Sequence, residues 1–307
     1  MKALLFPGQG SQIVGMGSEF YKNFSISKDI FQEADDKLNF KISKIILEGP
    51  ENELKLTKNT QPSILIVSYL IFTILKKEFG FKLDNTKFFA GHSLGEYSAL
   101  VCLESLMFRD ALYLLHERGK AMQEAVPLGQ GAMLAVLGLD NDSLINYISE
   151  IKNGVCEIAN DNSEGQIIVS GSIEAINILK INLKKDKKKS ISLPVSAPFH
   201  CSLMKPAAEK MKEKIEKTNF TSPRLEIITN VKATPEKDPN IIKKLLVEQI
   251  YSKVRWRESV IYMINNKIDE FIEIGPGKVL SSLVKRIDAN CKSSSINSIE
   301  DIKNIIK

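Results

Sequence analysis

The chain of 307 residues is poor in the features that mark several specialised classes of protein. Its four cysteines, at positions 102, 156, 201 and 291, show neither paired nor C-x-x-C spacing, so neither a disulfide framework nor a cysteine metal site is expected. No run approaches the roughly 18 apolar residues of a membrane span. The N-terminus, MKALLFPGQG, enters an expected strand at once, which leaves no room for a signal or transit peptide. We therefore expect a cytoplasmic protein with no membrane partner and no metal or redox cofactor.

Charge is also close to balanced. Lys and Arg number 42 and Asp and Glu 37, which gives a net charge of +5. This surplus allows an acidic partner without requiring one, and we expect no nucleic-acid partner. The single charge block, KKDKKK at 184–189, is interpreted as a solvated helix end or, alternatively, as a docking site for a partner.

The most informative stretch is FFAGHSLGEYSAL at 88–100. An apolar run fit for a buried strand leads into Gly91-His92-Ser93-Leu94-Gly95, and a helix is expected from Glu96 to Leu103. This G-x-S-x-G pattern is typical of a nucleophile elbow, a sharp strand-to-helix turn that exposes a serine hydroxyl. The helix start favours developing negative charge beside it. The sequence predicts that Ser93 is a nucleophile.

The order of expected elements predicts an α/β fold with two units. Residues 131–196 are expected to alternate as β-α-β-β-α-β, the ferredoxin-like order. We predict a small ferredoxin-like subdomain at 129–197, inserted into a larger α/β subdomain formed by 1–128 and 198–307. In the large unit, helices are expected at 14–20, 26–48 and 107–124, and another from 62 to 79 with Pro62 in its first turn.

Two further segments carry possible site residues. The Gly8-Gln9-Gly10 loop after the first strand (2–6) brings the backbone where another group can approach it closely. Arg118 falls on the apolar face of the helix 107–124, where an arginine needs a partner. That partner is either a structural carboxylate inside the protein or the carboxylate of a substrate.

A serine nucleophile needs a base, and the chain has three histidines. His92 adjoins Ser93 and is expected to point away from it. His116 is interpreted as a helix-edge residue. His200 follows an expected strand in the loop SAPFH, downstream of the serine, and is the best candidate. No aspartate or glutamate within a recognisable motif is available to orient His200, so a backbone carbonyl is the alternative.

These motifs together resemble one family over nearly the whole chain: malonyl-CoA:acyl carrier protein transacylases and the acyltransferase domains of polyketide and fatty acid synthases. The matching segments are FPGQGSQ at 6–12, GHSLGEYSAL at 91–100, ERGKAMQ around Arg118, PFH ending at His200, EQIYSKVRW at 248–256 and IEIGPG at 272–277. Lys253 departs from the proline that many members carry there.

The resemblance implies a hydrolase-like parallel-sheet core carrying the ferredoxin-like insert. It also implies a role for each matched residue: Ser93 as nucleophile, His200 as general base and acid, the Gln9 and Leu94 amides as oxyanion hole, the Gln249 carbonyl as the group that orients the histidine, Arg118 as the malonyl carboxylate site, and Phe199 as a mark of malonyl selectivity. The implied substrates are malonyl-CoA and the phosphopantetheine thiol of acyl carrier protein, and the implied state is a monomer.

Other functions remain open at this point. A serine esterase or thioesterase shares the elbow, but the inward Arg118 and the missing triad acid count against it. A non-catalytic scaffold is disfavoured by the intact Ser93 and His200. An acyltransferase for a polyketide system, or for another acyl-CoA, is not separated from one that supplies fatty acid synthesis.

Overall fold

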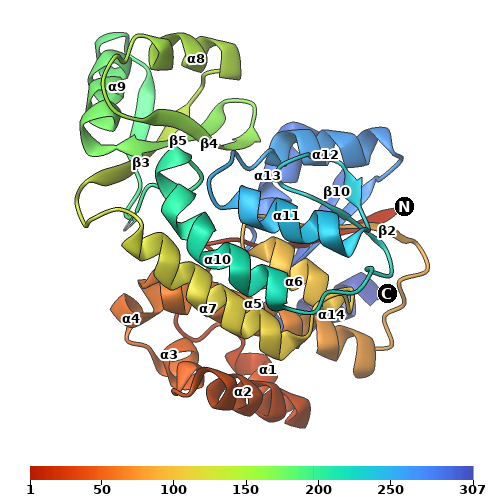
Figure 1. Cartoon of the computed structure of the whole chain (residues 1–307). Helices are drawn as coiled ribbons and strands as arrows, with labels where there is room; N and C mark the ends of the chain where they lie inside the picture. The colour runs from red at the N-terminus through yellow and green to blue at the C-terminus, as the bar shows by residue number, and fades with distance from the viewer. Residues whose placement is uncertain (196, 307) are drawn as a thin grey trace.

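The computed structural model describes residues 1–195 and 197–306. These residues form two sheets, a large one with five parallel strands and a small antiparallel one (Figure 1). The large sheet has the order β10-β9-β1-β2-β7-β8. Its strands are β1 (Lys2–Phe6), β2 (Thr86–Gly91), β7 (Glu226–Ile228), β8 (Pro235–Glu236), β9 (Glu270–Ile274) and β10 (Lys292–Ile296). Only β8 at one edge runs antiparallel to its neighbour. The predicted parallel-sheet core is confirmed.

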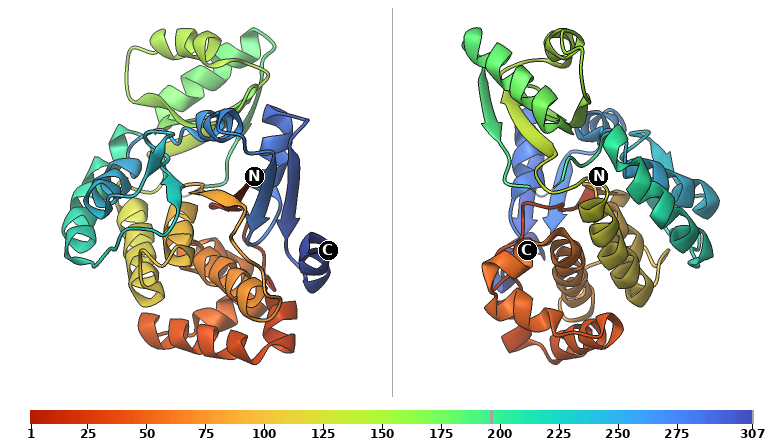
Figure 2. Two further views of the ribbon diagram at one scale, coloured as in Figure 1. Left: turned by 90° about the vertical axis from the view of Figure 1, so that its right-hand side faces the viewer. Right: turned by 60° about the vertical axis from the view of Figure 1, so that its left-hand side comes forward.

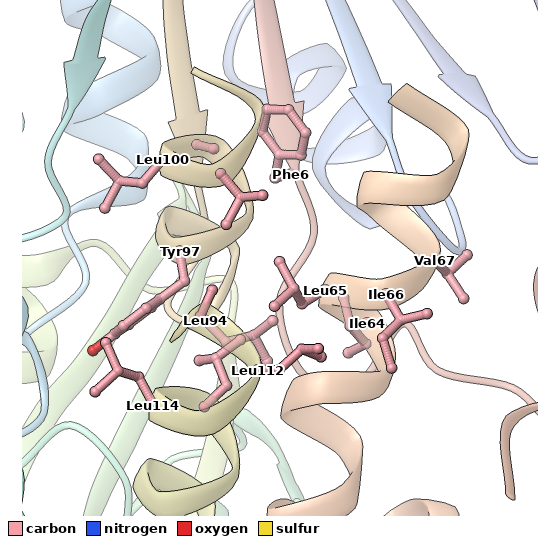
Figure 3. Close-up of a cluster of buried hydrophobic side chains, with 14 of the residues drawn as sticks. Phe6, Ile64, Leu65, Ile66, Val67, Leu94, Tyr97, Leu100, Leu112 and Leu114 are labelled. Atoms are coloured by element: carbon pink, nitrogen blue, oxygen red, sulfur yellow. The ribbon is translucent and has the colours of Figure 1, made fainter. Parts of the chain in front are cut away.

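Helices cover both faces of the large sheet, which explains why its central strands are apolar on both sides. Leu4, Phe6 and Phe89 pack with α5 (Thr57–Lys77), α6 (Gly95–Cys102) and α7 (Phe108–Glu124). The alternate residues Leu5 and Phe88 pack with α12 (Trp256–Asn265) and α13 (Val279–Ile287) on the opposite face. Figure 3 shows part of the first cluster, with labelled side chains of α5, α6 and α7 together with Phe6 of β1.

The small sheet has the order β4-β5-β3-β6. Along the chain its unit consists of β3 (Gly131–Leu137), α8 (Asn141–Ser149), β4 (Cys156–Ser163), β5 (Gln166–Ser172), α9 (Ile173–Lys185) and β6 (Lys189–Ser192). All three strand pairs are antiparallel. The predicted ferredoxin-like order is therefore confirmed. Its last strand ends at Ser192, short of the expected 196, and position 196 lies outside the described residues.

The small unit stands to one side of the large sheet (Figures 1 and 2). One face of its sheet packs against α8 and α9 around Leu134 and Val169. Met133, Ala135 and Ile168, on the other face, join the main core cluster of the large unit. The two units thus share apolar contacts along the side on which β2 ends.

The remaining helices cover the large unit. They are α1 (Ser18–Asn23), α2 (Ser25–Leu38), α3 (Ile42–Glu48), α4 (Glu51–Lys55), α10 (Lys205–Lys217), α11 (Pro239–Gln249) and α14 (Ile299–Ile306). Two expected helices differ. The one at 14–20 begins only at Ser18, and the one at 26–48 is split, because Asn39 adopts a left-handed conformation with φ 59° between α2 and α3. Within the described residues, no helix has both the length and the apolar content that crossing a membrane would need.

Pro62 lies inside α5, not in its first turn as predicted. A proline in a helix removes the N–H that would bond to the carbonyl four residues earlier, here that of Lys58. In this structure the Lys58 carbonyl accepts instead from His116 Nδ1 of α7, at 2.9 Å. Gly119 permits this approach, since a β-carbon there would lie 2.5 Å from the Lys58 Cα. Tertiary packing therefore satisfies the carbonyl that the proline leaves free.

Candidate active site

The turn from β2 to α6 holds Ser93 with φ 53°, a left-handed conformation that is rare for residues other than glycine. The two motif glycines make this turn possible. A β-carbon on Gly91 would lie 1.9 Å from the Gly95 carbonyl carbon, and one on Gly95 would lie 2.2 Å from the Phe6 carbonyl oxygen. The elbow is therefore packed so tightly against itself and against β1 that neither position can carry a side chain.

The Gly8-Gln9-Gly10 loop lies directly beside this elbow. A β-carbon on Gly8 would lie 2.7 Å from the His92 carbonyl oxygen, so the two backbones are in close contact. Gln9 and Leu94 both line the pocket that contains Ser93. Among the described residues, neither the Gln9 nor the Leu94 backbone N–H donates a hydrogen bond. Both amides are thus available at the pocket wall.

Ser93 Oγ lies 2.8 Å from His200 Nε2, although the residues are 107 positions apart. His200 Nδ1 lies 2.8 Å from the backbone carbonyl of Gln249. A carbonyl only accepts, so Nδ1 carries the proton and Nε2 presents a lone pair to the serine hydroxyl. Burial, and then the charge of Arg118, lower the pKa of His200 to about 3. The histidine is therefore neutral near pH 7 and able to accept a proton.

Arg118 is 1% exposed and reaches the same serine. Its Nη2 donates to Ser93 Oγ at 3.1 Å and to Gln249 Oε1 at 2.9 Å, and its Nη1 donates to Gln61 Oε1 at 2.7 Å. Its Nε has no partner among the described residues, and none of their carboxylates forms an ion pair with it. Burial lowers the pKa of Arg118 from its ordinary value. The one carboxylate whose charge acts on Arg118 among the described residues is Glu96, which opposes this lowering of the pKa without contacting Arg118 directly. A buried cation with no carboxylate in direct contact therefore faces the nucleophile.

The other two histidines make different contacts. His92 Nε2 bonds to Asn162 Oδ1 of β4 at 2.9 Å, which links the elbow to the small sheet. His116 bonds to the Lys58 carbonyl, as described above. Of the three histidines, His200 alone is hydrogen-bonded to Ser93 in the described structure.

The pocket around Ser93 has a volume of about 190 Å³. Its walls come from both units: Phe199 and Leu283 belong to the large unit, while Met133, Ile168 and Leu193 belong to the small one. Phe199 directly precedes His200 and is 6% exposed. The pocket is thus a mainly apolar chamber whose lining also includes the polar side chains of Ser93, His200 and Arg118.

Sequence reasoning missed three polar residues that hold this arrangement. Asn230 Oδ1 accepts from the Ser93 N–H at 2.7 Å, and Asn230 Nδ2 donates to the Gly91 carbonyl at 2.6 Å. Gln61 holds Arg118, and Glu96 accepts from Gln249. A signal existed for Asn230, which follows a strand beside β2, where parallel strands end at one edge of the sheet. A lone acid in the apolar helix EYSALVC was the signal for Glu96.

Among the described residues, no group of three His, Cys, Asp or Glu side chains is placed to hold a metal ion. All four cysteines are free thiols. The KKDKKK block runs from the end of α9 into β6 with mostly exposed side chains. The chemistry that this site can perform is acyl transfer through Ser93, with a neutral histidine as base and a cation to receive an anionic acyl group.

Comparison with known proteins agrees with this chemistry. The family model described as "Acyl transferase domain" matches residues 3–301. The malonyl CoA-acyl carrier protein transacylase of Bacillus subtilis is 43% identical over 304 residues, covering 98% of this chain and 95% of that protein. The Escherichia coli K12 protein of the same name is 40% identical over 297 residues, covering 96% and 95%.

Solved structures give the same result. The acyl-carrier-protein-S-malonyltransferase of Bartonella henselae superposes with a TM-score of 0.96 at 40% identity, covering 99% of this chain and 98% of that one. A malonyl-transacylase solved in complex with a type II PKS acyl-carrier protein has a TM-score of 0.96 at 38% identity, with the same coverage of 99% and 98%.

Proposed function

The chain belongs to the acyl transferase domain family, and we propose that it transfers the malonyl group from malonyl-CoA to the phosphopantetheine thiol of an acyl carrier protein through a malonyl-Ser93 intermediate. The observation that carries the proposal is the convergence of His200 Nε2 and Arg118 Nη2 on the Ser93 hydroxyl, at 2.8 and 3.1 Å. A base and a buried cation on one nucleophile suit an acyl group that ends in a carboxylate.

In the first half-reaction, His200 Nε2 takes the Ser93 proton while Oγ attacks the thioester carbonyl. The Gln9 and Leu94 amides receive the resulting oxyanion, a contribution worth about 3 kcal/mol for each donor in the transition state. The carbonyl re-forms as the carbon–sulfur bond breaks, and His200 returns the proton to the leaving coenzyme A thiolate. The Gln249 carbonyl keeps Nδ1 protonated throughout.

In the second half-reaction, the phosphopantetheine thiol of the carrier protein enters the pocket that coenzyme A has left. His200 removes the thiol proton, the sulfur attacks the malonyl ester, and Ser93 Oγ leaves and recovers the proton. The sequence is therefore ping-pong, because each thiol uses the same base and the same oxyanion site in turn.

Arg118 selects the acyl group. A malonyl carboxylate can accept two charge-assisted hydrogen bonds from a guanidinium, whereas an acetyl group leaves the buried cation without a counter-charge. Sites built to bond a polar group reject analogues that lack it by roughly 10⁴-fold. Phe199, in the pocket wall beside His200, favours malonyl over the bulkier methylmalonyl group.

We further propose a cytoplasmic monomer that needs no cofactor and binds two partners, the coenzyme A thioester and the acyl carrier protein. Malonyl units for fatty acid synthesis are the primary assignment. The type II PKS complex among the structural relatives makes a polyketide carrier the specific second candidate.

A two-step mass experiment tests the function. The protein is mixed with malonyl-CoA, the added malonyl mass is located by peptide mapping, and holo acyl carrier protein is then added. Malonyl on Ser93 that moves to the carrier thiol supports the proposal, with a Ser93→Ala variant as the control that takes up no malonyl. An adduct lost to water at the same rate with or without carrier would indicate a hydrolase instead.

A further inference from the structure

Glu96 is a buried acid with no part in the transfer steps above. It is 1% exposed and lies in the first turn of α6, three residues after Ser93. Its Oε2 accepts from Gln249 Nε2 at 2.7 Å and from the Asn230 N–H at 3.1 Å, while its Oε1 has no partner among the described residues. Burial raises the pKa of Glu96 to about 7, so keeping an acid here costs stability.

The Gln249 side chain connects this acid to Arg118. Its Nε2 donates to Glu96 Oε2 and, at 3.1 Å, to the Ser93 carbonyl, and its Oε1 accepts from Arg118 Nη2. An amide has a donor end and an acceptor end that can exchange places by rotation. Two acceptors at one end fix the donor there, which leaves the oxygen facing the arginine.

We propose that Glu96 is a positioning residue that holds the Arg118 guanidinium, through the Gln249 amide, in the orientation that receives a carboxylate-bearing acyl group. This rests on the proposed function of the site. Glu96 also holds Asn230, whose side chain bonds to the Ser93 N–H, so a general effect on the elbow must be separated from a selective effect on the arginine.

The intervening amide explains why the acid is not placed directly on the arginine. A direct ion pair would orient the guanidinium and also neutralise it, leaving less attraction for a substrate carboxylate. A neutral amide between the two groups transmits orientation and leaves the positive charge available. The unpartnered Arg118 Nε is consistent with a guanidinium whose donors are not all used within the protein.

The test measures the rates at which malonyl-CoA and acetyl-CoA acylate Ser93, using intact mass to detect the acyl-enzyme. The ratio of the two rates is compared between the wild-type protein and the variants Glu96→Ala and Glu96→Gln. We expect Glu96→Ala to lower the malonyl-to-acetyl rate ratio by about tenfold or more, because a misplacement near 1 Å can cost up to about 100-fold. Glu96→Gln keeps an oxygen that can accept both bonds, so its ratio stays within about threefold of wild type. Glu124→Ala, on the exposed side of α7, is the matched control and leaves the ratio unchanged.

A double-mutant cycle adds a readout that a purely structural role would not give. In an Arg118→Ala background, Glu96→Ala is expected to change the ratio by less than about twofold, because residues that act through one another are not additive. Equal losses with malonyl and acetyl donors, or additive losses in the cycle, would overturn the proposal. If Glu96→Ala does not fold, Gln249→Leu removes the connecting amide and is subject to the same two criteria.

Failure of the proposed function would be seen separately. A wild-type protein that forms no malonyl-Ser93 adduct refutes the transferase assignment before any variant is compared. A wild-type protein that transfers malonyl, with a Glu96→Ala variant of unchanged ratio, refutes only the role of Glu96.

Discussion

Replacing Arg118 with alanine tests the central electrostatic feature of the site. The guanidinium is 1% exposed, donates to Ser93 Oγ at 3.1 Å, and forms no ion pair with a carboxylate of the described residues. In the mechanism that we propose, the malonyl carboxylate supplies its counter-charge. The substitution therefore removes two different interactions, one common to every acyl donor and one specific to malonyl.

The two losses differ in size. The hydrogen bond to Ser93 is available with any acyl group, and because its donor is charged, its removal costs about 1.5–3 kcal/mol, or roughly tenfold to 10²-fold in rate. Removing one partner of a buried ion pair costs about 3–5 kcal/mol, which corresponds to roughly 10²-fold to several thousand-fold. We therefore expect malonyl transfer to fall by at least about 10³-fold in total, and acetyl transfer by no more than about 10²-fold.

The assay is single-turnover acylation by malonyl-CoA and acetyl-CoA, quenched and followed by intact mass. The ratio of the two rates serves as an internal control, because a partly unfolded preparation lowers both equally. Arg109→Ala removes a charge from the exposed side of the same helix and should leave the ratio unchanged. Equal losses for both donors in Arg118→Ala would refute the assigned role of the arginine.

Three further predictions concern the histidine, the elbow and the buried acid. Because burial and the charge of Arg118 lower the pKa of His200 to about 3, the acid limb of the pH profile for acylation should lie well below the ordinary histidine pKa of 6.5; a limb at 6.5 or above contradicts this. Gly91→Ala should lower the free energy of unfolding by about 3 kcal/mol or more, measured by urea unfolding, because its β-carbon would lie 1.9 Å from the Gly95 carbonyl carbon. A variant as stable as the wild type would disprove this steric argument. The pKa of Glu96, raised from 4.5 to about 7, means that the folded state binds more protons than the unfolded state between these values, so this group lowers stability as pH rises through that window. Glu96→Gln should therefore gain up to about 3 kcal/mol relative to wild type between pH 4.5 and 8, and a pH-independent difference in unfolding free energy would contradict the shift.

Much of the fold follows from local sequence signals. Alternating strand and helix patterns predicted an α/β fold and the β-α-β-β-α-β insert, and the family resemblance implied the parallel core. The G-x-S-x-G pattern predicted the turn that carries Ser93 with φ 53°. The predicted position of Pro62 in the first turn of its helix was wrong because of a tertiary contact. Pro62 is tolerated inside α5 because His116 of α7 takes up the Lys58 carbonyl, a contact between residues 58 positions apart.

The sequence by itself determined which chemical groups this protein has and the local geometry of the nucleophile, because glycine sterics and strand and helix patterns act over a few residues. Only the tertiary structure decided how those groups are charged and aimed. Arg118 meets Gln61 and Gln249 across 57 and 131 positions, and Gln249 meets Glu96 across 153. The proton position on His200 and the unneutralised state of Arg118 depend on burial and on which distant carbonyls and amides surround them, and no local pattern encodes that.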